Sequence, residues 1–140
     1  MKQIKVDTGL VTYRLNDAVD VQINTTDITF IGKILDVADS LEEKQKEVDK
    51  ALSDDKDVRE QINGAKKLDT EMREQINGIF GKDICTPLIG DMNIWALGIE
   101  TGAPIWANIL FGLLDEMEAN LPKEGEVAKK VEKYTKKYRK

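Results

Sequence analysis

The sequence predicts a mainly α-helical protein of the α+β class. An N-terminal β-hairpin is followed by a long helix hairpin, a loop-rich segment and two C-terminal helices. One change of pattern separates the hairpin from the helices. Before residue 24, apolar and polar residues alternate, which is the period of a half-buried strand; after Thr26 the apolar spacing becomes three and four residues, which is the period of an amphipathic helix. A chain of 140 residues is long enough to bury a hydrophobic core of its own.

The first 24 residues have the pattern of a β-hairpin. Residues 3–7 and 10–23 are predicted to be extended, and the pair Asn16-Asp17 interrupts the second alternating run, as in a tight turn between two strands. A two-stranded hairpin is only marginally stable in water. We therefore expect it to pack on a helix or to pair with another chain, because an exposed strand edge is a docking site.

Residues 26–81 are predicted to form a hairpin of two helices. The polar run Thr25-Thr26-Asp27 is typical of a helix N-cap. Apolar residues then recur at helical spacing up to residue 52, and the polar residues 53–57 make the turn. Helical spacing resumes at Val58 and ends at Gly81, which suits a left-handed C-cap.

The hexapeptide REQING occurs twice in the second of these helices, at residues 59–64 and at residues 73–78. The two copies are 14 residues apart, which is close to four helical turns. Both copies should therefore face the same way on one continuous helix.

Residues 82–102 are predicted either to be irregular or to contain one short helix around residues 93–97. The next helix opens near Pro104, a residue that is favoured in the first turn. It carries the broadest apolar face of the chain, and we expect its central residues to form the middle of the core: Trp106, Ile109, Leu110 and Leu113.

The sequence suggests one acidic globular domain at residues 1–122, followed by a basic C-terminal helix at residues 123–140. Within the domain, residues 1–24 form the β-hairpin, residues 26–81 the helix hairpin, and residues 82–122 the loop and the core helix. Residues 1–120 contain 13 Lys/Arg and 23 Asp/Glu, whereas residues 121–140 contain 8 and 3. The acidic body argues against nucleic acid as a partner, because phosphate binding needs a basic face.

The basic helix is the candidate partner-binding element. Its apolar side chains share one face, and its lysines lie mostly off that face. Two arrangements are open: the helix packs on the acidic body of its own chain, or it docks onto a client or a second copy, with the aromatic residues as anchors and the lysines speeding the encounter. The candidate binding residues are Val127, Val131, Tyr134, Tyr138, Lys130 and Lys137.

The residue types that catalysis and metal binding require are scarce. The chain has no histidine, which removes the commonest general base and metal ligand. Its one cysteine, Cys85, allows neither an internal disulfide nor a thiolate zinc site within the chain. No phosphate-loop, dinucleotide or nucleophile-elbow motif occurs. We therefore expect no enzymatic activity, no catalytic residue, no cofactor and no metal site.

The N-terminus lacks the apolar core of a secretion signal, and the most apolar run, residues 105–114, is too short to span a bilayer. We therefore expect a protein of the cytoplasm with no membrane partner.

Several segments together resemble a family of small proteins from tailed phages and prophages of Gram-positive bacteria. The resemblance covers most of the chain. It lies in NTTDITFIGKI and LEEKQKEVDKAL in the first half, and in LDTEMREQINGIFG, CTPLIGDMNIWAL, PIWANILFGLLDEME and the ending VEKYTKKYRK in the second.

These small proteins look like tail assembly chaperones of long-tailed phages, encoded between the genes for the tail tube and the tape-measure protein. The resemblance implies a viral protein of the host cytoplasm that binds the tape-measure protein or tail tube subunits, with self-association as a further option. Two other functions remain open: a phage-encoded acidic inhibitor of a host defence protein, and a structural component of the tail or neck.

Overall fold

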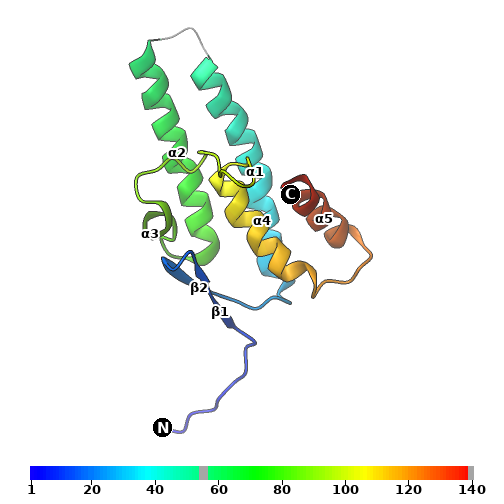
Figure 1. Ribbon diagram of the computed structural model, residues 1–140. Coiled ribbons are helices and arrows are strands. Elements are labelled where there is room, and N and C mark those ends of the chain that lie inside the picture. Colours follow the sequence, from blue (N-terminus) through cyan, green and yellow to red (C-terminus); the bar gives the residue numbers. More distant parts are fainter. Residues whose placement is uncertain (54–56, 139–140) are drawn as a thin grey trace.

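The computed structural model describes residues 1–53 and 57–138. As predicted, it is mostly helical, with a two-stranded N-terminal hairpin, a long helix hairpin and two C-terminal helices (Figure 1). In chain order the elements are β1 (Val11–Leu15), β2 (Val19–Ile23), α1 (Ile28–Ser53), α2 (Val58–Phe80), α3 (Cys85–Ile89), α4 (Ile105–Glu118) and α5 (Glu126–Tyr138). Of the turn predicted at residues 53–57, residues 54–56 lie outside the described residues.

The strands β1 and β2 pair antiparallel, with Val11 opposite Ile23 and Leu15 opposite Val19. The predicted turn is present: Asn16 and Asp17 both have positive φ angles, a conformation that Asn and Asp tolerate better than most residues. The prediction that residues 3–7 also form a strand is wrong. They run beyond the sheet as an exposed arm, because no other strand in the described part of the chain pairs with their backbone.

The helices α1 and α2 pack against each other as a long hairpin whose far end projects beyond the other elements (Figure 1). Asp27 starts α1, because its Oδ1 accepts hydrogen bonds from the backbone N–H groups of Thr29 at 3.0 Å and Phe30 at 3.3 Å. At the other end of the hairpin, Gly81 closes α2 with a φ of 68°, as its position predicts.

The loop between α2 and α4 contains one short helix, α3. The prediction that this helix lies at residues 93–97 is wrong, because those residues form turns and irregular chain. Asn77 explains the position of α3, because its Oδ1 accepts hydrogen bonds from the N–H groups of Ile84 at 2.9 Å and Cys85 at 3.1 Å. These N–H groups are at the start of α3, where no partner within the helix exists. A side chain from another helix therefore caps α3 together with the local Asp83, whose Oδ1 accepts a hydrogen bond from the N–H of Thr86 at 3.1 Å.

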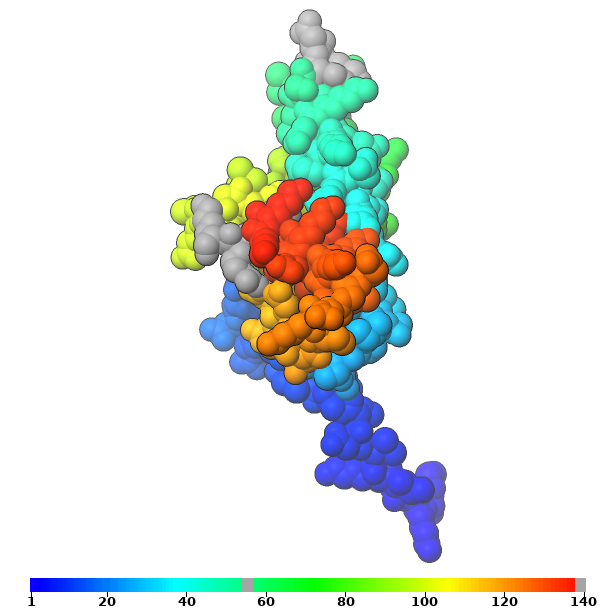
Figure 2. Space-filling model, turned by 90° about the vertical axis from the view of Figure 1, so that its right-hand side faces the viewer, coloured from blue at the N-terminus to red at the C-terminus, as the bar shows by residue number. Residues whose placement is uncertain are grey.

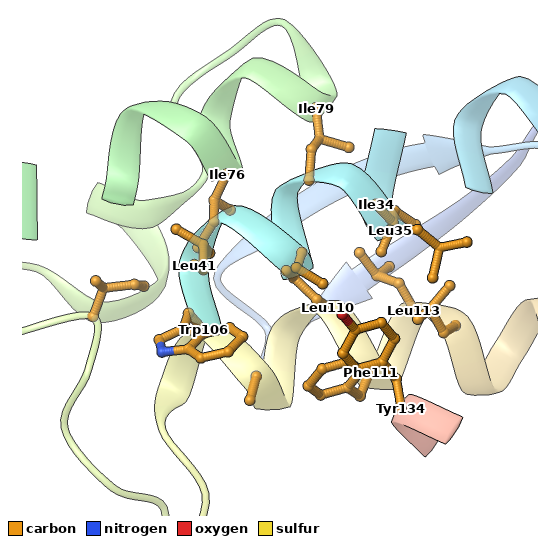
Figure 3. Close-up of a cluster of buried hydrophobic side chains, with 14 of the residues drawn as sticks. Ile34, Leu35, Leu41, Ile76, Ile79, Trp106, Leu110, Phe111, Leu113 and Tyr134 are labelled. Carbon is orange, nitrogen blue, oxygen red and sulfur yellow. The ribbon is translucent and has the colours of Figure 1, made fainter. Parts of the chain in front are cut away.

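Helix α4 is the centre of the core, as predicted (Figure 3). Trp106, Leu110 and Leu113 are buried, and α4 packs against α1 and α5. The Trp106 indole Nε1 also donates a hydrogen bond to Oε1 of Gln45 on α1, at 2.9 Å. Ile109 is an exception to the prediction: it is only partly buried and lines a surface groove beside β1.

Helix α5 lies across α4 and α1 (Figure 2). Its apolar stripe is continuous with the main core, since Val131 and Tyr134 are fully buried. The packing of the tail on its own chain is therefore the arrangement that the structure contains. Among the described residues, no helix combines the length and apolar character needed to cross a membrane.

Candidate functional site

The six residues predicted to bind a partner all belong to α5, but the folded chain itself covers part of their surface. Val131 is buried, and the Tyr134 ring stacks on Phe111 with 5.0 Å between ring centroids (Figure 3). Val127 is exposed. The side chain of Tyr138 lies outside the described part of the molecule.

The two candidate lysines pair with carboxylates on α1. Lys130 Nζ lies 2.7 Å from Oδ2 of Asp39, and Lys137 Nζ lies 3.3 Å from Oε1 of Glu42. The Tyr134 hydroxyl donates a hydrogen bond to Oδ1 of Asp39. A basic and aromatic face therefore meets an acidic helix within one chain, and a role of this face in partner binding stays a prediction that would require α5 to leave the body.

The Asp39 carboxylate accepts hydrogen bonds from both Lys130 and Tyr134, and its pKa is lowered. Partial burial raises the pKa of this carboxyl group, but the hydrogen bonds from Lys130 and Tyr134 lower it more, so that the pKa lies below its ordinary value of 3.8. A group whose pKa is lower in the folded protein contributes stability above its ordinary pKa. That contribution is lost as the pH falls through the folded-state value.

The change Asp39→Asn is therefore expected to lower the free energy of unfolding near neutral pH by about 1 kcal/mol or less, because the ion pair is half exposed. The difference from the wild type should disappear as the pH falls below 3.8. Urea unfolding followed by circular dichroism, near neutral pH and at a pH well below 3.8, measures this difference in the free energy of unfolding. Asp36→Asn, an exposed position on the same helix, is the control. A difference that persists in acid would contradict this contribution of Asp39.

A second candidate site lies on α2, where the repeated hexapeptide has two different environments. In the copy at residues 73–78, called the occupied copy, Arg73 binds the backbone of the following loop. Its Nη2 donates a hydrogen bond to the carbonyl oxygen of Gly90 at 2.7 Å and another to that of Met92. Its Nε donates to Oδ2 of Asp69 at 3.0 Å, which holds the guanidinium in place.

The asparagine of the occupied copy, Asn77, binds the start of the same loop. Besides capping α3, it donates from Nδ2 to Oδ1 of Asp83 at 3.0 Å. Between the arginine and the asparagine, Ile76 is 0% exposed. The occupied copy therefore holds residues 83–92 by main-chain hydrogen bonds on both sides of a buried apolar side chain.

The copy at residues 59–64, called the open copy, has its equivalent side chains at the surface. Arg59 and Asn63 are exposed, and Ile62 is 47% exposed, in contrast to the buried Ile76. Val58, which is 66% exposed, corresponds to Met72, which is 0% exposed. These residues surround a shallow hollow near the end of the projecting hairpin, with the following lining: Asp57, Val58, Arg59, Ile62, Asn63 and Lys66.

The sequence contained the signal for this site, since both copies of REQING are visible in it. The repeat by itself predicts that α2 is continuous, which is correct. What the sequence does not reveal is that the loop after α2 folds back onto one copy and not onto the other.

Within the described residues, no three His, Cys, Asp or Glu side chains lie where they would hold a metal ion together. Comparison of the chain with protein-family models, with curated proteins and with solved structures finds no match.

Proposed function

We propose that this protein is a tail assembly chaperone of a long-tailed phage, and that the open copy of REQING binds a segment of the tape-measure protein. The observation that carries the binding site is the difference between the two copies. The arginine and the asparagine of the hexapeptide hold a loop at one position and are exposed at the other. The choice of client rests on the resemblance of the chain to small phage tail proteins.

The contacts of the occupied copy indicate what the open copy can bind. The side chains of Arg73 and Asn77 contact mostly backbone groups, at carbonyl oxygens and N–H groups respectively. Backbone hydrogen bonds do not depend on the side chains of the bound segment. A site of this kind suits a client that presents free backbone groups beside an apolar side chain, for example where a helix ends or is interrupted.

Exposed apolar side chains supply the second argument. Val58 and Ile62 lie on the same side of α2, and Leu52 is exposed at the end of α1. Complete burial of one such side chain contributes about 1.5–3 kcal/mol. A partner that covers this end of the hairpin therefore gains affinity from apolar contact, while Arg59 and Asn63 orient it.

The position of the open copy supports the same conclusion. Figures 1 and 2 show that the hairpin extends past α4 and α5, so that neither helix covers this part of α2. A long client can therefore reach the open copy while the core of the chaperone stays intact.

The double change Arg59→Ala and Ile62→Asp tests the proposal. The tape-measure protein is co-expressed with the full chain, and co-purification and the dissociation constant are measured. We expect affinity to fall about tenfold or more, since an apolar contact and a charge-assisted hydrogen bond are both lost. Stability should change by only about 0.5 kcal/mol, because both residues are exposed.

The matched control is the double change Lys67→Ala and Thr70→Ala, which alters two exposed residues of α2 outside the open copy and outside the hollow. It should leave the affinity unchanged. Equal binding by the first variant and the wild type would overturn the role of the open copy. A wild-type chain that stays in purified virions would favour a structural tail component instead, and capture of a host defence protein without the tape-measure protein would favour the inhibitor.

A further inference from the structure

The N-terminal arm, residues 1–10, leaves its apolar side chains uncovered. Ile4 is 88% exposed, Val6 is 70% exposed and Leu10 is 53% exposed. In an extended chain, every second side chain points to the same side, so Ile4 and Val6 share one side of the arm. Figures 1 and 2 show the arm pointing away from the body, at the opposite end from the projecting hairpin.

The base of the arm is held in a defined direction. The side chain of Asn24, directly after β2, donates from Nδ2 to the carbonyl oxygen of Thr8 at 2.9 Å. Gly9 has a φ of 67°, and its N–H donates to Oδ1 of Asp7 at 2.9 Å. A Cβ atom at Gly9 would lie only 2.7 Å from Asn24 Nδ2, so the close approach of the arm to Asn24 requires glycine.

An apolar groove of about 590 Å³ lies along the other side of the hairpin, next to β1. No residue of β2 lines it, so it follows the edge of β1 that has no strand partner among residues 1–53 and 57–138. Most of its lining is apolar and comes from β1, α3 and α4, including Tyr13, Leu15, Leu88, Ile89, Ile105 and Ile109. We call it the β1 groove.

We propose that two copies of this chain exchange their arms, and that the arm of each lies in the β1 groove of the other. The arm would add a third strand at the free edge of β1 and direct Ile4 and Val6 into the groove. An exchange in both directions gives a closed two-fold dimer and buries these side chains of both arms.

The observations favour a second copy over the chain's own arm. The groove lies beside residues 13–16, near the turn of the hairpin, whereas the arm leaves from the opposite end of β1. Its bond to Asn24 fixes it beside the end of β2, which directs it away from its own groove.

Sedimentation equilibrium of the full chain tests the exchange. We expect a dimer at micromolar concentration. Val6→Asp should weaken it about tenfold or more, since a charge replaces an apolar contact at each of two sites. The matched control is Gln3→Asp, which adds the same charge on the other side of the arm. Because Val6 is exposed, its replacement leaves the core intact. A monomeric wild type, or equal dimerisation of both variants, would overturn the proposal.

Disulfide trapping tests the location of the arm. One preparation carries Val6→Cys and another carries Ile109→Cys, and oxidation of the mixture should yield a covalent dimer that contains one chain of each kind. The native Cys85 does not interfere, because it is buried and burial raises the pKa of its thiol to about 11. If the mixture gives no more dimer than either preparation alone, the arm does not lie in the groove. This readout is independent of the tape-measure experiment, which concerns the opposite end of the molecule.

Discussion

Replacement of Leu110 by alanine is expected to lower the free energy of unfolding by about 2–5 kcal/mol. Leu110 is 0% exposed and lies in the middle of α4, between residues of α1 and α5 (Figure 3). Alanine leaves an unfilled space that surrounding helices, held by their own contacts, close only in part. Both the lost apolar burial and the remaining cavity therefore contribute to the cost.

Urea unfolding followed by circular dichroism measures this loss. Glu116→Ala, an exposed position on the same helix, is the control and should change the free energy by about 0.5 kcal/mol or less. A loss below about 0.5 kcal/mol for Leu110→Ala would mean that this face of α4 is not the core of the protein.

Replacement of Tyr134 by alanine is expected to cost about 3–5 kcal/mol, the range for buried aromatic residues. The ring is 1% exposed, stacks on Phe111 and connects α5 to the main core. Its hydroxyl donates to Asp39, so Tyr134→Phe separates the two contributions: loss of the hydroxyl alone should cost about 0.5–1.5 kcal/mol.

Differential scanning calorimetry of the two variants decides the state of α5. Lys129→Ala is the control, because this side chain is 75% exposed on the same helix. If Tyr134→Ala unfolds at the wild-type temperature, α5 does not pack on the body in solution. Its residues would then be available to a client or to a second copy of the chain, which is the other arrangement that the sequence left open.

Local patterns were sufficient to predict most elements. The change of apolar period near Thr26 separates the hairpin from the helices, and Gly81 marks the end of α2. The errors occurred where local pattern was a poor guide. Residues 3–7 alternate as a strand does, but a strand also needs a neighbour. Ile109 has the apolar character of a core residue, yet it lies at a groove.

The candidate sites depend more than the helices and strands do on contacts between residues that are distant in the sequence. The sequence by itself determined the helical and strand periods, the repeat of REQING and the apolar and basic faces of the last helix, because these follow from spacing along the chain. Only the tertiary structure decided that α5 covers its own apolar face and that the loop after α2 occupies one copy of REQING. Which surfaces remain exposed depends on packing between segments far apart in sequence, and identical residues such as Ile62 and Ile76 can therefore have opposite environments.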